Sequence, residues 1–152
     1  CLMPCNLFGP NDNYDTQNSH FLPALIKKIY LASKKRGKNK IVKLWGTGKP
    51  LREVLHVDEV ANACEFFLRK KTNNFLINIG SSIEMSIKNY ANLIKNKIDT
   101  EVLVKFDNNR KLDGVMRKKL NLSLANSYGW KSRMNFSKVL DEIIEDFKSS
   151  YK

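Results

Sequence analysis

The stretch Arg52-Glu53-Val54-Leu55-His56-Val57-Asp58 gives the clearest indication of the fold. Residues 52–57 form a mainly apolar run with the length of a strand, and Asp58 then offers a carboxylate N-cap to a helix. That helix is predicted from apolar residues at helical spacing: Val60, Ala61, Cys64, Phe67 and Leu68. His56, inside the strand, is interpreted as a structural histidine. A strand that leads directly into a helix is typical of an α/β protein.

Short apolar runs bounded by Gly, Pro or polar residues predict further strands at 2–8, 41–45, 75–80 and 101–106. The run at 75–80 is nearly continuously apolar, as in a strand covered on both faces. Apolar residues at helical spacing predict helices from Phe21 to the basic cluster at 34–40, after the N-cap Ser86, near Leu122–Tyr128, and across Val139–Phe147. The order is not a strict βα alternation, so we predict part of a doubly wound α/β sheet with a smaller α+β lobe.

The length of 152 residues allows one domain, and 42% hydrophobic residues are enough to bury a core. No uncharged stretch is long enough to cross a bilayer, and three irregularly spaced cysteines argue against a disulfide framework and a metal site. We therefore expect a cytoplasmic protein with no metal. The chain begins at Cys1 without an initiator Met or a signal-peptide pattern, which indicates the interior of a longer protein.

The composition is strongly basic, because 27 Lys and Arg against 15 Asp and Glu give a formal net charge of +12. This charge is compatible with a nucleic-acid partner, with a site for a small polyanion, or with solvated surface lysines. Basic clusters occur at 34–38, 69–71 and 117–119, but basic residues also recur singly along most of the chain. That distribution favours a solvated surface for most of the charge.

The common phosphate-binding and metal-binding motifs are absent, including G-x-G-x-x-G after a strand, G-K-[ST], C-x-x-C and H-E-x-x-H. Gly46-Thr47-Gly48-Lys49 resembles a phosphate loop only superficially, since its spacing is too short and Pro50 follows it. We interpret these glycines as a turn.

Three side chains are candidates for function. His20 lies on a polar loop before a helix, where an imidazole can exchange a proton near neutral pH or simply form surface. Arg52 begins an apolar strand and could hold phosphate oxygens in a bidentate fork, or pair with Glu53 or Asp58. Trp45, at a strand end, could stack on a ligand ring or belong to the core.

Five stretches carry a resemblance that runs in order along almost the whole chain: Pro4–Asn13, Asn18–Leu25, Trp45–Asp58, Ile77–Gly80 and Asp113–Lys118. They resemble the GDP-L-fucose synthases, NADP-dependent epimerase/reductases of the extended short-chain dehydrogenase group. The Gly-Pro and Arg-Glu-x-x-His-Val-Asp elements are shared by many nucleotide-sugar epimerases and dehydratases. The Asn-Ser-His-x-x-Pro-Ala-Leu and Trp-Gly-x-Gly-x-Pro-x-Arg-Glu elements are more specific.

The resemblance implies the C-terminal part of a Rossmann-like extended short-chain dehydrogenase fold, with the last strands of the sheet and a small α+β substrate-binding lobe. Residues 1–152 would then be the mostly substrate-binding, C-terminal part of an NAD-dependent epimerase/dehydratase domain. The N-terminal dinucleotide-binding part, the Tyr-x-x-x-Lys and the catalytic Cys would be missing. We therefore expect the chain to be inactive alone, and the full-length enzyme to be a homodimer that binds neither nucleic acid nor membrane.

The resemblance also implies a reaction, the NADPH-dependent 3,5-epimerisation and 4-reduction of GDP-4-keto-6-deoxy-D-mannose to GDP-L-fucose. His20 would be one member of the acid/base pair that inverts C3 and C5 of this GDP-sugar. Contacts with NADP(H) are implied for Pro4, Cys5, Asn6, Leu7 and His20. Contacts with the substrate are implied for Lys28, Trp45, Arg52 and Lys118.

Two other interpretations stay open. The chain could belong to another nucleotide-sugar epimerase or reductase of the same superfamily, which substrate profiling of the full-length enzyme would distinguish. It could also be a basic nucleic-acid-binding module, which is suggested only by the charge and would bind with a steep salt dependence.

Overall fold

The computed structural model describes residues 1–15, 18–37 and 40–151, so Lys38 of the first basic cluster lies outside the described residues. The helices are α1 (Phe21–Ser33), α2 (Val57–Leu68), α3 (Ile87–Ile98), α4 (Ser123–Ser127) and α5 (Phe136–Ser150), with a 3-10 turn at Arg110–Leu112. The strands are β1 (Leu2–Pro4), β2 (Asn6–Phe8), β3 (Ile41–Leu44), β4 (Leu51–His56), β5 (Ile77–Ile79), β6 (Glu84–Ser86), β7 (Leu103–Phe106) and β8 (Arg117–Lys118). This mixture of helices and strands confirms the predicted α/β class.

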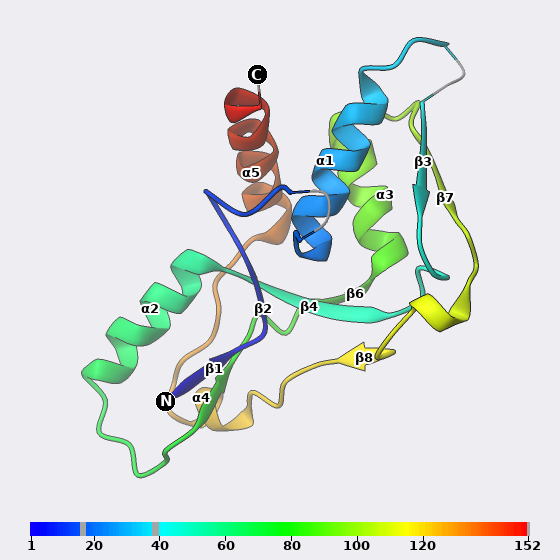
Figure 1. Ribbon diagram of the computed structural model, residues 1–152. Helices are drawn as coiled ribbons and strands as arrows, with labels where there is room; N and C mark the ends of the chain where they lie inside the picture. The colour runs from blue at the N-terminus through cyan, green and yellow to red at the C-terminus, as the bar shows by residue number, and fades with distance from the viewer. Residues whose placement is uncertain (16–17, 38–39, 152) are drawn as a thin grey trace.

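Strand β4 lies in the middle of the molecule and pairs along its whole length (Figure 1). Its C-terminal half runs parallel to β2, with Phe8 opposite His56. Its N-terminal half pairs antiparallel with β6 and parallel with β8, so that Arg52 lies opposite Lys118. Two further parallel pairs, β1 with β5 and β3 with β7, flank it. Strand β4 therefore positions three other strands, β2, β6 and β8.

The apolar residues of the described chain pack into two clusters, and β4 contributes to both. Val54 belongs to a large cluster with residues of α1, α3, α5 and β3. Leu55 belongs to a smaller cluster with residues of α2, β5 and α4. Successive strand residues point to opposite faces, so two neighbouring side chains of β4 enter different clusters. In Figure 1 the helices α1, α3 and α5 accordingly lie on one side of β4, and α2 and α4 on the other.

The helices begin close to the predicted positions, with one difference in capping. Ser86 caps α3 as predicted, since its Oγ accepts a hydrogen bond from the Asn89 N–H at 3.1 Å. The predicted cap of α2, Asp58, is wrong. His56 is the N-cap instead, because its Nδ1 accepts the Asp58 N–H at 3.3 Å. His56 is buried and contacts the Phe8 ring edge-on, which confirms its structural role.

Two strand predictions need correction. The run 2–8 is two strands, because the chain bends at Cys5. Before the bend β1 pairs with β5, and after it β2 pairs with β4. The strand predicted at 75–80 covers only Ile77–Ile79. Its ladder with β1 starts at Ile77, and Phe75 before it is 95% exposed rather than covered on both faces. Strands β6 and β8 were not predicted, since two or three residues are too few to show a period.

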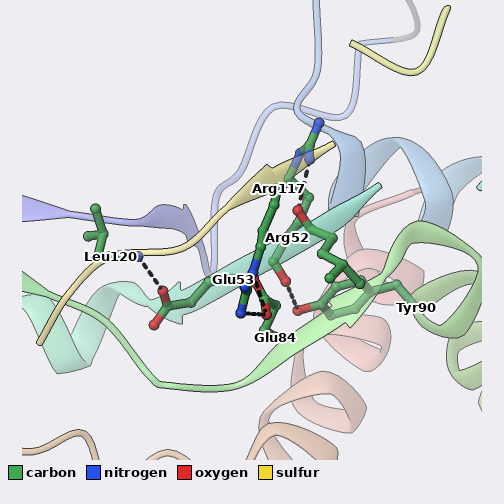
Figure 2. Close-up of polar contacts among 7 residues, drawn as sticks. Arg52, Glu53, Glu84, Tyr90, Arg117 and Leu120 are labelled. Carbon is green, nitrogen blue, oxygen red and sulfur yellow. Dashed lines mark hydrogen bonds and ion pairs between the residues drawn. The ribbon is translucent and has the colours of Figure 1, made fainter. Parts of the chain in front are cut away.

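Glu53 lies in β4 and is fully buried, yet it finds backbone partners for both carboxylate oxygens. Its Oε1 accepts the Ser82 N–H at 2.8 Å. Its Oε2 accepts the Leu120 N–H at 3.2 Å, as Figure 2 shows. A Cβ at Gly80 would overlap this carboxylate, so glycine allows the close approach. The Glu53 backbone carbonyl also accepts a hydrogen bond from Asn6 Nδ2 at 2.8 Å. Glu53 therefore ties β4 to β2 and to the segments that follow β5 and β8.

Replacing Glu53 should destabilise the protein, because two buried N–H groups would lose their acceptors. We expect Glu53→Ala to lower the free energy of unfolding in urea, followed by circular dichroism, by about 2–4 kcal/mol. Glu53→Gln keeps one acceptor oxygen and should lose less. Glu145→Ala, which removes an exposed carboxylate near Lys148, is the matched control and should change stability by less than about 0.5 kcal/mol. Equal losses in Glu53→Ala and the control would contradict the structural role of Glu53.

Candidate functional site

A cleft of about 320 Å³ opens where α1, the turn after β3, β4 and the segment before β8 meet. Three of the four predicted substrate contacts line it: Lys28 from α1, Trp45 from the end of β3, and Arg52 from β4. Much of the remaining wall is apolar, with Phe21, Leu25, Pro50, Ile87 and Leu112 among its residues. A mainly apolar hollow with a few convergent charged groups is the usual form of a small-molecule site.

Lys28 and Trp45 contact each other at this cleft. The Lys28 Nζ lies 5.1 Å from the centre of the Trp45 ring, which is a cation–π distance. Trp45 is 73% exposed, so the alternative that it belongs to the core is wrong. The pair presents a positive charge and a flat aromatic face to a ligand.

Arg52 uses one nitrogen of its guanidinium to hold backbone. Its Nη1 donates to the Leu51 carbonyl at 2.8 Å and to the Val115 carbonyl at 2.7 Å. In the part of the chain that the structure describes, Arg52 has no ion pair with Glu53 or Asp58. Both of these bonds use Nη1, so the Nε and Nη2 edge of the guanidinium can make the bidentate contact with an anion that the functional interpretation requires.

Lys118 lies beside the cleft rather than in it. It is exposed on β8, opposite Arg52 in the register of the parallel pair, and it is not among the residues that line the hollow. Its neighbour Arg117 pairs with Glu84 of β6 through its Nη2 at 2.9 Å (Figure 2). This hydrogen-bonded pair lowers the pKa of the Glu84 carboxyl and raises that of Arg117.

The Gly-rich stretch after β3 is a turn, as predicted. Gly46 and Gly48 have φ values of +73° and +71°, which side chains with a Cβ rarely adopt. The carboxylate of Asp113 accepts the Thr47 N–H at 2.6 Å and the Thr47 hydroxyl at 2.7 Å. These hydrogen bonds hold the pKa of Asp113 below its ordinary value. Asp107 accepts the Gly46 N–H at 2.8 Å, so two carboxylates fix the turn.

A second hollow, of about 500 Å³, lies at the carboxyl end of β2 and beside the start of α2. Ligands of parallel α/β sheets bind outside the carboxyl ends of the strands. Four of the five predicted cofactor contacts line this groove, namely Cys5, Asn6, Leu7 and His20. Pro4, the fifth, lies in β1 and is not part of the lining.

His20 lies between the two hollows. It lines the groove, while its chain neighbours Ser19 and Phe21 line the cleft. It is exposed at the N-cap position of α1, where its side chain makes no capping hydrogen bond. An imidazole in this position can exchange protons with a ligand that reaches from one hollow to the other.

Cys5 lines the groove as a neutral thiol. Burial, and secondarily the negative charge of Glu53, raise the pKa of the Cys5 thiol to about 12. A raised pKa keeps this sulfur largely in the thiol form at neutral pH, and a thiol is a poor nucleophile. Cys1 and Cys64, by contrast, are exposed.

The described residues form neither a metal-ligand cluster nor a membrane-spanning helix. No set of three or more His, Cys, Asp or Glu side chains among them is grouped as a metal ion would require. None of their helices combines the length and the apolar character needed to span a bilayer.

The fold and the two hollows define an α/β protein with a groove at the strand ends and a basic, aromatic cleft next to it. The family model described as "NAD dependent epimerase/dehydratase family" matches residues 1–80, more than half of the chain. The chain belongs to this family.

Individual relatives point to GDP-sugar enzymes. GDP-L-fucose synthase 1 of Arabidopsis thaliana is 41% identical over 140 residues, which cover 92% of this chain and 42% of the relative. The solved GDP-L-fucose synthetase of Naegleria fowleri bound to NADP is 26% identical, with a TM-score of 0.87 over 99% of this chain and 46% of that one. A GDP-D-glycero-L-gluco-heptose synthase of Campylobacter jejuni reaches a TM-score of 0.80 at 27% identity and covers 98% of this chain and 52% of that one.

These matches confirm the resemblance to GDP-L-fucose synthases and the Rossmann-like α/β class. The chain spans about half the length, or less, of the relatives it matches.

Sequence reasoning gave no role to Asp113 or Glu53 at this site. Asp113 was part of a resembling stretch, and a carboxylate within the strongly basic segment 110–119 was the available signal. For Glu53 the sequence suggests only an ion pair with Arg52. Both carboxylates accept hydrogen bonds from groups far along the chain, backbone N–H groups in each case and also the Thr47 hydroxyl for Asp113, and such pairings have no sequence signature.

The raised pKa of Cys5 can be tested by alkylation. With iodoacetamide at pH 8, followed by peptide mass spectrometry, Cys5 should react roughly a hundredfold or more slowly in the folded chain than in urea, because little thiolate is present. Cys1 and Cys64 are the internal controls and should react quickly in both states. Equal rates for all three thiols in the folded chain would show that Cys5 is not held neutral.

Proposed function

We propose that this chain is the substrate-binding, C-terminal part of a GDP-L-fucose synthase, an enzyme that converts GDP-4-keto-6-deoxy-D-mannose to GDP-L-fucose. The observation that carries the proposal is the convergence of Lys28, Trp45 and Arg52 on one cleft from three different elements. The relatives named GDP-L-fucose synthase supply the ligand class. Because the chain matches only part of each relative, the catalytic activity is proposed for an enzyme that contains this part.

The cleft suits a nucleoside diphosphate-sugar for electrostatic reasons. A diphosphate carries several negative charges, and Lys28 and Arg52 place two cations along the same hollow. Lys28 acts as a point charge, whereas Arg52 offers a planar fork, so the two cations recognise phosphate differently. The exposed ring of Trp45 adds a flat surface for a base or sugar, and Lys118 beside Arg52 extends the positive field.

The groove at the end of β2 suits NADP(H). Its lining by Cys5, Asn6, Leu7 and His20 combines a neutral thiol with apolar and amide groups at a strand end. When bound, NADPH supplies hydride for reduction of a carbonyl. In this proposal Cys5, Asn6 and Leu7 orient the nicotinamide side of the cofactor, and the Asn6 amide is held in place by the Glu53 carbonyl.

His20 is proposed to exchange the protons of epimerisation. The C4 carbonyl of the keto-sugar acidifies the C–H bonds at C3 and C5, so a base and an acid of ordinary strength can invert both centres. His20 borders the cleft and the groove and is exposed to a ligand in either.

The homodimer of the full-length enzyme, implied by the resemblance, remains a prediction.

A related GDP-sugar reductase is the second candidate. The likeness to the Campylobacter jejuni heptose synthase favours it, since both that protein and the fucose synthases have names that specify a GDP-sugar. Turnover of a panel of GDP-4-keto-sugars by the full-length enzyme separates the two candidates.

The role of Arg52 can be measured on this chain by titrating it with GDP in a calorimeter. We expect Arg52→Ala to weaken binding by about 2–5 kcal/mol, because a charge-assisted contact in the cleft is lost. Arg52→Lys should recover part of the loss, since it keeps the charge without the fork. Arg69→Ala removes an exposed arginine next to Glu65 on α2 and should leave the dissociation constant unchanged. An unaltered constant for Arg52→Ala would count against the proposed phosphate contact.

The role of His20 requires the enzyme that includes its cofactor-binding part. In deuterium oxide, His20→Ala should incorporate deuterium at C3 and C5 of the keto-sugar about 10²–10⁴-fold more slowly, because one acid/base group is missing. NADPH binding, followed by nicotinamide fluorescence, should weaken far less. Normal deuterium incorporation in the variant would refute the assignment.

A further inference from the structure

Residues 110–118, here called the strap, comprise the 3-10 turn, β8 and the segment between them, and they form one side of the cleft. Leu112 and Asp113 of the strap line the hollow. Its far end is bound to β4, where the Leu51 N–H donates to the Met116 carbonyl at 2.8 Å and Arg52 donates to the Val115 carbonyl. The strap therefore reaches from the Trp45 side of the cleft to the Arg52 side.

Little apolar burial holds the strap in place. Leu112, Val115 and Met116 are 52%, 56% and 50% exposed, so the hydrophobic effect contributes less here than in the core. Hydrogen bonds must carry more of the positioning. The Thr47 N–H and hydroxyl both donate to the Asp113 carboxylate, at 2.6 and 2.7 Å, and bonds to a charged acceptor are stronger than neutral ones.

The partner of Asp113 belongs to the turn 46–50, which carries the opposite wall. Trp45 precedes this turn, and Gly48 and Pro50 within it line the cleft. The carbonyls of Gly48 and Pro50 accept the N–H groups of Lys88 and Ile87 at the start of α3. A Cβ at Gly46 would overlap the Asp113 carboxylate, so the turn is shaped to receive it.

We propose that Asp113 is a positioning residue that clamps the strap to the turn through Thr47 and thereby sets the spacing between Trp45 and Arg52 across the cleft. The part of this inference that concerns affinity rests on the proposed function, because it takes GDP as the ligand. The clamp itself concerns only the chain and has its own structural readout. Asp113 does not contact the reacting atoms in this proposal, since both of its oxygens are directed to Thr47.

Thr47 is the better residue to change, because Asp113 lines the cleft and Thr47 is not among the lining residues. Thr47→Val has nearly the same shape but lacks the hydroxyl donor, and Thr47→Ser keeps it. Thr100→Val is the matched control, because Thr100 is exposed in the turn after α3. Thr47→Ala serves as a second variant if the valine does not fit.

Two measurements test the clamp in these variants. Hydrogen–deuterium exchange with mass spectrometry should show faster exchange in residues 45–50 and 110–118 of Thr47→Val, with the helices unchanged. Calorimetry should show that GDP binds Thr47→Val about tenfold more weakly, the loss expected for one hydrogen bond to a charged group. Thr47→Ser and Thr100→Val should match the wild type in both.

The outcomes separate this inference from the function on which it partly rests. If GDP binds the wild type and Thr47→Val equally well, or if exchange in the strap does not change, Asp113 is not a positioning residue and the inference is overturned. If the wild type does not bind GDP, the proposed function fails, and the affinity part of the inference falls with it. In that case faster exchange in the strap of Thr47→Val still supports the clamp, and unchanged exchange in the strap overturns it.

Discussion

The rest of the structure depends most on the two hydrogen bonds that the buried Glu53 carboxylate accepts from backbone N–H groups. A carboxylate without water needs hydrogen-bond donors, and here they are the backbone N–H groups of Ser82 and Leu120. These donors lie in segments distant in sequence that reach β4 from different directions. Satisfying one charge therefore fixes the paths of two loops, and the second of these loops follows directly after β8 and Lys118.

The alternation of side chains along β4 connects this constraint to the site. Arg52 and Glu53 are neighbours in sequence but serve opposite faces, since Arg52 lines the cleft while Glu53 is enclosed. The two charges consequently do not neutralise each other. Tyr90 of α3 holds the backbone of β4 at this point, because its hydroxyl donates to the Arg52 carbonyl at 3.0 Å (Figure 2). The backbone that carries the arginine is thus held independently of its guanidinium.

Only a small part of the net charge of +12 lies at the cleft. Lys28 and Arg52 are gathered in a hollow that is otherwise mainly apolar, whereas most other basic residues lie exposed along helices and loops. An apolar wall lowers the effective dielectric around the two cations and strengthens their attraction for an anion. The proposal that this anion is a nucleoside diphosphate-sugar draws on the names of similar proteins, among them GDP-L-fucose synthase 1 of Arabidopsis thaliana.

The sequence by itself determined the helices, the α/β class and the turn at 46–50, because periodic apolar residues and glycine dihedral freedom act locally. It also pointed to Trp45 and Arg52 through their positions at the ends of predicted strands, and to Lys28 through the resemblance to a family. Only the tertiary structure decided that the run 2–8 divides at Cys5, that His56 caps α2, and that Lys118 lies outside the cleft. The sequence likewise did not predict the hydrogen bonds that Glu53 and Asp113 accept from backbone N–H groups. Such contacts join residues far apart in the chain and leave no period or spacing in the sequence from which they could be predicted.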